Sequence, residues 1–144
     1  MRSVLVISSF LLSYSSSISQ SLRQHQWEDR VILIFANSEN NERLQEQLQL
    51  LQVNEAELKD RDLVTYQVFD QKAFGPDGDS IKMKWADQLR SRYNKDENPF
   101  FFILIGKDGG VKLRSDQVVG MEKLFALIDG MPMRRAEMRK KDGK

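Results

Sequence analysis

The chain has 144 residues, of which 40% are apolar and 30% charged, and 22 Lys and Arg against 21 Asp and Glu give a formal net charge of +1. This length suffices for one domain with its own core, and the balanced charge does not favour nucleic acid as a partner. The chain has no cysteine, which excludes disulfides, thiolate nucleophiles, Cys-ligated zinc and iron–sulfur clusters.

The N-terminal segment has the pattern of a secretory signal peptide. One positive charge at Arg2 precedes an apolar run at 4–12, and a serine-rich stretch ends in the small-x-small sequence Ser17-Ile18-Ser19. We therefore expect a signal peptide at 1–19, cleaved after Ser19, and a secreted or periplasmic protein. The apolar run is shorter than the roughly 20 residues that span a bilayer, so no stable membrane insertion is expected after cleavage. The alternative is an uncleaved cytoplasmic N-terminus that happens to be apolar.

The first half of the remaining chain predicts two parallel strands and two helices. Residues 31–37 form a continuous apolar run, typical of a strand buried on both faces, and leucines at helical spacing predict a helix over 38–58. Residues 63–69 form a second strand, and the helix between the strands requires them to be parallel. A polar loop over 70–80 leads to a helix at 80–93.

The second half predicts an antiparallel hairpin and a further helix. Residues 100–105 and 111–114 are strands joined by a turn at 107–110, where Asp-Gly is a strong hairpin signal. An amphipathic helix at 121–128 is expected to end at Gly130 in a left-handed cap. Pro132 is then expected to open a short helix, followed by a solvated tail from Arg134 onward.

The predicted order of elements is β-α-β-α-β-β-α, which is the order of the thioredoxin fold. We therefore predict an α/β protein, a thioredoxin-like three-layer sandwich with a mixed four-stranded sheet and helices on both faces. A single domain is expected at 20–138, with a charged C-terminal tail at 139–144.

Three stretches of sequence resemble a known family. They are LIGKDGGVKLRS at 104–115, LFALIDGMPMRRAEM at 124–138 and RDL at 61–63. Together they resemble the thioredoxin-like family catalogued as domain of unknown function 4174, over about residues 22–138. The resemblance implies a thioredoxin-like fold and an extracytoplasmic setting, because the domain occurs in bacterial, often exported, proteins. It also occurs in animal matrix proteins, namely the sushi-repeat-containing proteins and a coiled-coil-domain protein. It implies no established activity and supplies no catalytic residue.

The start of the first helix corresponds to the redox site of active thioredoxins. There, two cysteines follow the first strand, and the helix dipole lowers the pKa of the first thiol. The corresponding positions here are Asn40, Asn41, Glu42 and Arg43, so thiol–disulfide oxidoreductase activity is excluded. We favour a helix-capping role for this segment, by Asn37, Ser38 or Asn40, over a ligand site. Pro99 lies near the position of a cis-proline in redox-active relatives, and the sequence leaves its isomer open.

The main candidate binding surface is basic. Its residues are Lys107, Lys112, Arg114, Arg134 and Arg135. If they converge, they would suit an acidic polymer such as an anionic glycan. We favour the alternative, a salt-bridge network with Asp62, Asp108, Asp129 and Glu137, because the net charge is close to zero.

Other polar patterns are interpreted as structural. GKDGG at 106–110 is a hairpin turn because a strand follows it, whereas a P-loop requires a helix. The spacing of Asp70, Asp77, Asp79 and Asp87 does not match an EF-hand, and we predict no metal or other cofactor. His25, the single histidine, is expected on the surface. Trp27 and Trp85 are expected to pack in the core or at element edges.

Two classes of function remain open. The first is an exported non-redox module that acts by binding, with a protein or an anionic glycan as its partner. It includes a purely structural role that offers a sheet edge or the basic residues. The alternative is an enzyme of unidentified class that uses a cleft at the carboxyl ends of the strands. Asn37, Asn40 and residues near Pro99 would line that cleft, with Asp or Glu as acid and base. We favour the first class and assign no catalytic residue.

Overall fold

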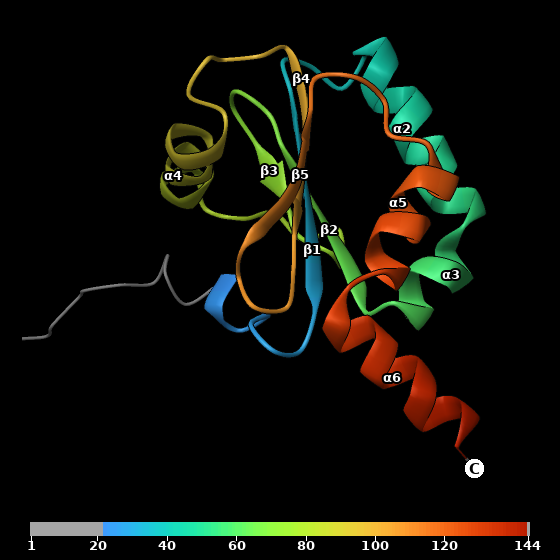
Figure 1. Ribbon diagram of the computed structural model, residues 1–144. Helices are drawn as coiled ribbons and strands as arrows, with labels where there is room; N and C mark the ends of the chain where they lie inside the picture. The colour runs from blue at the N-terminus through green and yellow to red at the C-terminus, as the bar shows by residue number, and fades with distance from the viewer. Residues whose placement is uncertain (1–21, 144) are drawn as a thin grey trace, which may run out of the picture.

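The computed structural model describes residues 22–143. A mixed sheet lies between two layers of helices, with α4 on one face and α2, α3 and α5 on the other (Figure 1). The elements in chain order are β1 (Arg30–Ala36), α2 (Glu42–Val53), α3 (Glu55–Asp60), β2 (Leu63–Val68), β3 (Ala73–Phe74), α4 (Met83–Tyr93), β4 (Phe100–Ile105), β5 (Val111–Ser115), α5 (Met121–Asp129) and α6 (Pro132–Asp142).

The sheet has the strand order β3-β2-β1-β4-β5. β1 pairs in parallel with β2, as predicted from the helical crossover, and antiparallel with β4. β4 and β5 form the predicted hairpin, and β2 and β3 pair antiparallel at the other edge. The sheet is therefore mixed, with β1 at its centre.

The position of β1 at the centre of the sheet accounts for its apolar sequence, because all seven of its residues are buried. Successive side chains of a strand point to opposite faces, so Ile32 and Ile34 pack toward α2 and α5, whereas Leu33 and Phe35 pack toward α4. An apolar run without polar alternation is what a strand between two helical layers requires.

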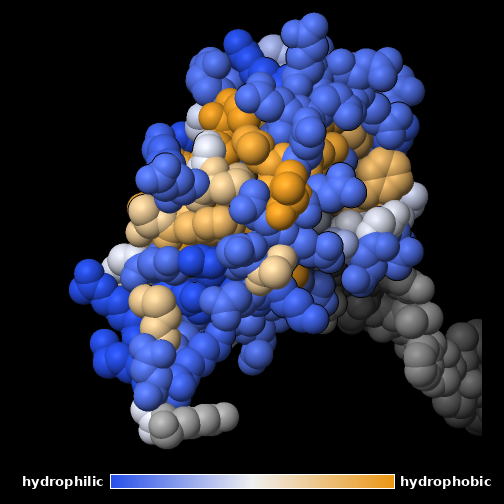
Figure 2. Space-filling view, turned by 90° about the vertical axis from the view of Figure 1, so that its right-hand side faces the viewer, coloured by the Kyte–Doolittle hydropathy of each residue, from blue (hydrophilic) through white to orange (hydrophobic). Residues whose placement is uncertain are grey.

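The face covered by α2 and α5 retains apolar surface. Leu48 and Phe125 are partly buried against the core, and Leu127 is 37% exposed. Figure 2 shows apolar surface gathered on this side of the molecule, with hydrophilic residues around it. The guanidinium of Arg61 lies 4.3 Å from the centre of the Phe125 ring and so covers part of this surface.

The predicted fold class is confirmed, but details differ. The sheet has five strands instead of four, because residues 73–74, predicted as loop, pair with β2. The helix predicted over 38–58 is two helices, α2 and α3, with Asn54 between them. A strand of two residues has no pattern of its own, and a single break does not disturb the spacing of the leucines. Neither difference could be read from periodicity.

The C-terminal region differs most from the prediction. Gly130 has φ −76° and ψ −13°, so it is right-handed and not the predicted left-handed cap. Pro132 opens a helix as predicted, but α6 continues to Asp142. Arg134, expected in a solvated tail, is buried. The expectation of a solvated tail was wrong for Arg134, because it treated charge as a sign of exposure, whereas residues 139–143 are exposed.

The backbone of the described residues bears on two of the sequence predictions. Residues 22–143 contain no cis peptide bond, so the bond before Pro99 is trans. Within the same range, no helix is both long and apolar enough to cross a bilayer. The predicted signal peptide and its cleavage after Ser19 lie outside the described residues.

Candidate functional site

The start of α2 is held by Asn41, which is its N-cap. The Asn41 Oδ1 accepts a hydrogen bond from the backbone N–H of Leu44 at 3.1 Å. Its Nδ2 donates to Asn37 Oδ1 at 3.0 Å and to the carbonyl of Pro99 at 3.1 Å. The segment therefore does cap the helix, but through Asn41 instead of Asn37, Ser38 or Asn40. One amide side chain also ties the β1–α2 turn to the loop before β4.

The neighbouring positions of the degenerate redox site also have structural contacts or face solvent. Glu42 lies in the first turn of α2, where a carboxylate complements the positive end of the helix dipole. Arg43 donates to the carbonyl of Asp116 at 3.1 Å, which links α2 to the loop after β5. Asn40 is exposed.

A polar groove lies beside this turn, at the carboxyl ends of β1 and β2. It consists of two hollows, of about 460 and 520 Å³, that share Asn37 and Asp70. Glu97, Asn98 and Pro99 line the first hollow. Ser38, Glu39, Asn40 and Lys72 line the second. We call this continuous surface the carboxyl-edge groove.

The uncompensated charge of the carboxyl-edge groove is negative. Lys72 and Glu39 form an ion pair of 2.6 Å, and Arg90 is engaged by Asp87 and by the carbonyl of Phe69. The carboxylates of Asp70 and Glu97 are exposed and form no ion pair with any described residue. Glu97 also has φ 51°, a conformation that costs a non-glycine residue about 1–2 kcal/mol. The groove therefore offers two free carboxylates.

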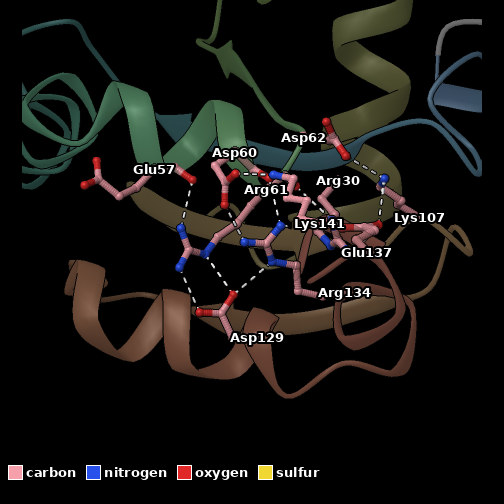
Figure 3. Close-up of polar contacts among 10 residues, drawn as sticks. All are labelled: Arg30, Glu57, Asp60, Arg61, Asp62, Lys107, Asp129, Arg134, Glu137 and Lys141. Carbon is pink, nitrogen blue, oxygen red and sulfur yellow. Dashed lines mark hydrogen bonds and ion pairs between the residues drawn. The ribbon is translucent and has the colours of Figure 1, made fainter. Parts of the chain in front are cut away.

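A second concentration of charge lies where α6 meets the end of the sheet (Figure 3). We call it the ion cluster. Its members are Arg30, Asp60, Arg61, Asp62, Lys107, Asp129, Arg134, Glu137 and Lys141. Glu137 contacts three cations, with distances of 3.2 Å to Arg30, 2.8 Å to Lys107 and 3.8 Å to Arg134. The side chains of these cations are 1%, 8% and 4% exposed, respectively.

The ion cluster shifts the pKa values of five members toward their charged forms: Asp60, Lys107, Asp129, Arg134 and Glu137. Hydrogen bonds from Lys141 and Arg134 lower the pKa of Asp60 to about 2. Burial opposes the charge of Glu137, but hydrogen bonds from Lys107 and Arg30 hold its pKa below the usual value. Burial likewise opposes the charge of Lys107, and hydrogen bonds to Asp62 and Glu137 nevertheless raise its pKa. The cluster is therefore a set of mutually stabilised charges.

Comparison with known proteins now adds to this geometry. A family model described as "Domain of unknown function (DUF4174)" matches residues 21–137. The chain belongs to this family. A search of curated proteins gives no match for the DUF4174 chain.

A solved structure supports the fold of the DUF4174 chain. The reduced 2-Cys peroxiredoxin of Plasmodium vivax is similar, with a TM-score of 0.52 and 13% sequence identity. The match covers 80% of this chain and 84% of the peroxiredoxin chain. At this identity the likeness shows the thioredoxin-like fold alone. The name of that protein refers to two cysteines, and the DUF4174 chain has none.

The five basic residues predicted as a surface of the DUF4174 chain do not all lie on its surface. Lys107 and Arg134 are buried in the ion cluster. Lys112 is paired with Asp108 at 2.8 Å. Arg114 and Arg135 are exposed, on β5 and α6 respectively. Ion pairs with the four predicted acidic partners are present: Asp62, Asp108, Asp129 and Glu137.

Two expectations about single residues were wrong. His25 is 8% exposed, and its Nδ1 and Nε2 lie 2.7 Å from Asp29 Oδ2 and from the Tyr66 hydroxyl. Trp27 is 60% exposed, whereas Trp85 packs in the core as predicted. The i, i+4 spacing of His25 and Asp29 was the one local signal that this turn is ordered.

Proposed function

We propose that this DUF4174 domain is an exported, non-redox module that binds a partner protein through the carboxyl-edge groove. The observation that supports this most directly is the set of side-chain hydrogen bonds made by Asn41. This residue stands at the degenerate redox position, and its side chain makes three hydrogen bonds: one caps α2, and two tie the groove residues Asn37 and Pro99 to the start of that helix. A wall fixed in this way is pre-organised, which reduces the entropy lost on binding.

The partner segment that fits this groove is cationic. Asp70 and Glu97 supply carboxylates without an ion pair among the described residues, and the exposed Asn37 lines both hollows together with Asp70. Lysine or arginine side chains complement this surface in charge and in hydrogen-bond donors. Two hollows that share residues suit an extended segment better than a compact ligand.

An anionic glycan is a weaker candidate for the partner. Lys107 and Arg134 are compensated inside the ion cluster and Lys112 is paired with Asp108, which leaves Arg114 and Arg135 to attract a polyanion. Retention on heparin resin tests this directly. If Lys112→Glu/Arg114→Glu elutes at the same salt concentration as the wild type, these two residues do not bind an anionic glycan.

Pentalysine is a suitable probe for the groove, and amide NMR shifts of the exported protein are a suitable readout. We expect its largest shifts at Asn37, Asp70 and Glu97, and an affinity about tenfold lower in Asp70→Asn/Glu97→Gln. The matched control is Asp77→Asn/Asp79→Asn, which removes two exposed carboxylates outside the groove. Shifts spread over all acidic surfaces, or equal losses in both double variants, would refute the groove as the binding site.

Export is tested separately by the N-terminus of the protein in its native host. The proposal expects a mature chain that begins at Gln20 and is recovered outside the cytoplasm. Recovery from the cytosol alone, with Met1 present, would overturn this part of the proposal. It would leave the binding result unaffected.

An enzyme is the second candidate, because Asp70 and Glu97 line one hollow and are able to act as acid and base. The two candidates differ in what happens to a bound ligand. A binding module returns its native ligand unchanged. An enzyme converts the ligand, and Asp70→Asn/Glu97→Gln would then retain it unconverted.

A further inference from the structure

A further pocket lies at the opposite end of β1 from the carboxyl-edge groove. Its volume is about 560 Å³, within the range of small-molecule sites. It is formed by the turn at 22–29, by α4 and by hairpin residues within 105–109. The turn, blue in Figure 1, comes directly before β1. We call this hollow the N-terminal pocket, and it shares no residue with the groove.

The N-terminal pocket combines an apolar part with polar side chains, and the apolar part comes from the sheet and α4. Val31 and Ile105 face each other across β1 and β4 and contribute the sheet side. Leu89 and Tyr93 contribute the α4 side, and Leu22 lies on the turn. Such a lining removes the apolar body of a ligand from water, which is worth about 25 cal/mol per Å² of buried area.

The turn that forms one wall is fixed by several contacts. His25 is held between Asp29 and Tyr66 at 2.7 Å on each side. The backbone N–H of Trp27 donates to the carbonyl of Lys107 at 2.6 Å, and Gln26 Nε2 donates to the carbonyl of Asp108 at 3.3 Å. The pocket is therefore formed without a ligand.

Trp85 supplies a second observation. It lines the pocket and is 6% exposed, yet its indole Nε1 has no hydrogen-bond partner within residues 22–143. Buried polar groups are nearly always paired, so this donor is an exception. Because the Nε1 atom is itself closed to solvent, a ligand in the pocket contacts the indole ring and not its N–H.

The charges around the pocket indicate which ligand it would take. Four charged side chains line it, and the carboxylates of Asp29 and Asp108 contact His25 and Lys112. The other two are Arg23 and Arg92, both exposed, and neither has an ion-pair partner in the described part of the chain. Guanidinium groups bind carboxylates and sulfonates through paired hydrogen bonds.

We propose that the N-terminal pocket binds a small amphipathic organic anion. Its apolar or aromatic body lies against the sheet and α4, and its acidic group is bound by Arg23 and Arg92. This site is independent of the proposed function, because a ligand here touches no residue of the carboxyl-edge groove.

Two dyes with the same ring system test the proposal. 8-Anilinonaphthalene-1-sulfonate carries a sulfonate, and N-phenyl-1-naphthylamine lacks it. We expect Arg23→Gln/Arg92→Gln to weaken binding of the sulfonate by about tenfold or more and to leave the neutral dye within about twofold. Arg114→Gln/Arg135→Gln, which removes two exposed arginines elsewhere, is the matched control and should change neither dye.

Tryptophan emission locates the bound dye. The chain has two tryptophans, and Trp27 is 60% exposed and does not line the pocket, so Trp27→Phe leaves Trp85 as the reporter. We expect saturating sulfonate dye to quench Trp85. The proposal is overturned if Trp85 does not respond, if the arginine double variant binds the sulfonate unchanged, or if both dyes weaken equally.

Discussion

Replacement of Glu137 by alanine tests whether the ion cluster holds α6 on the sheet. Glu137 receives two hydrogen bonds from Arg30, at 3.2 and 3.3 Å, and a 2.8 Å contact from Lys107. After its removal, Lys107 keeps Asp62 and Arg134 keeps Asp60 and Asp129. The guanidinium of Arg30, whose side chain is 1% exposed, keeps only its hydrogen bond to the carbonyl of Arg61 among the described residues. The variant therefore leaves one guanidinium buried without a counter-ion.

The magnitude follows from this burial. Breaking a fully buried ion pair costs about 3–5 kcal/mol. Glu137 is itself 23% exposed and two of its three cations keep other partners, so we expect Glu137→Ala to lower the free energy of unfolding by about 2–3 kcal/mol. Urea denaturation followed by circular dichroism measures this. The control is Glu46→Ala, an exposed glutamate on α2 that pairs with no cation in the described part of the chain, which should cost less than about 0.5 kcal/mol.

A second substitution distinguishes the cost of an unpaired buried charge from the cost of losing the contact that holds α6. Arg30→Met in the Glu137→Ala background removes the uncompensated guanidinium and should restore about 1 kcal/mol or more. The reasoning fails if Glu137→Ala costs no more than Glu46→Ala. It fails equally if Arg30→Met adds its own loss to that of Glu137→Ala, because the two residues would then act independently.

Three further predictions concern other contacts. Asn41→Asp keeps the cap acceptor but loses both donors, so urea denaturation should show a loss of about 1 kcal/mol; an unchanged midpoint would contradict the role of the Pro99 contact. Tyr66→Phe leaves His25 Nε2 without its hydroxyl partner and should cost about 1–2 kcal/mol in thermal denaturation, whereas an unchanged Tm would argue against that bond. The lowered pKa of Asp60, about 2, means that its contribution is complete above its ordinary value of 3.8 and is lost as pH falls toward about 2. The urea midpoint should therefore fall across this range and fall less in Asp60→Asn.

The fold was predictable because its central elements carry their own signals. The apolar run of β1 could only be a strand between two layers, and the Asp-Gly turn between β4 and β5 required a hairpin. Helix α6 was misjudged for the opposite reason. Its residues are charged, and only the three-dimensional arrangement shows that Arg134 and Glu137 meet partners from distant parts of the chain.

The candidate sites were less predictable, because their residues come from separate elements. The capping role at the first helix was local and could be inferred, yet the choice of Asn41 depended on the carbonyl of Pro99, 58 positions away. His25 is paired with Asp29 nearby, but its burial depends on Tyr66, 41 positions away. A sequence identifies residues able to form such contacts, and the fold decides which of them do.

The stretches on which the family resemblance rests meet at one place in the structure. RDL supplies Arg61 and Asp62 to the ion cluster, GKDGG supplies Lys107, and the last stretch supplies Asp129, Arg134 and Glu137. In this chain, the residues that carry the family resemblance are therefore largely those that attach α6 to the sheet. The carboxylates of the groove and the arginines of the pocket that form no ion pair with a described residue lie outside these stretches, at Asp70, Glu97, Arg23 and Arg92. On both binding proposals, variants at these four positions should therefore alter binding while the fold persists.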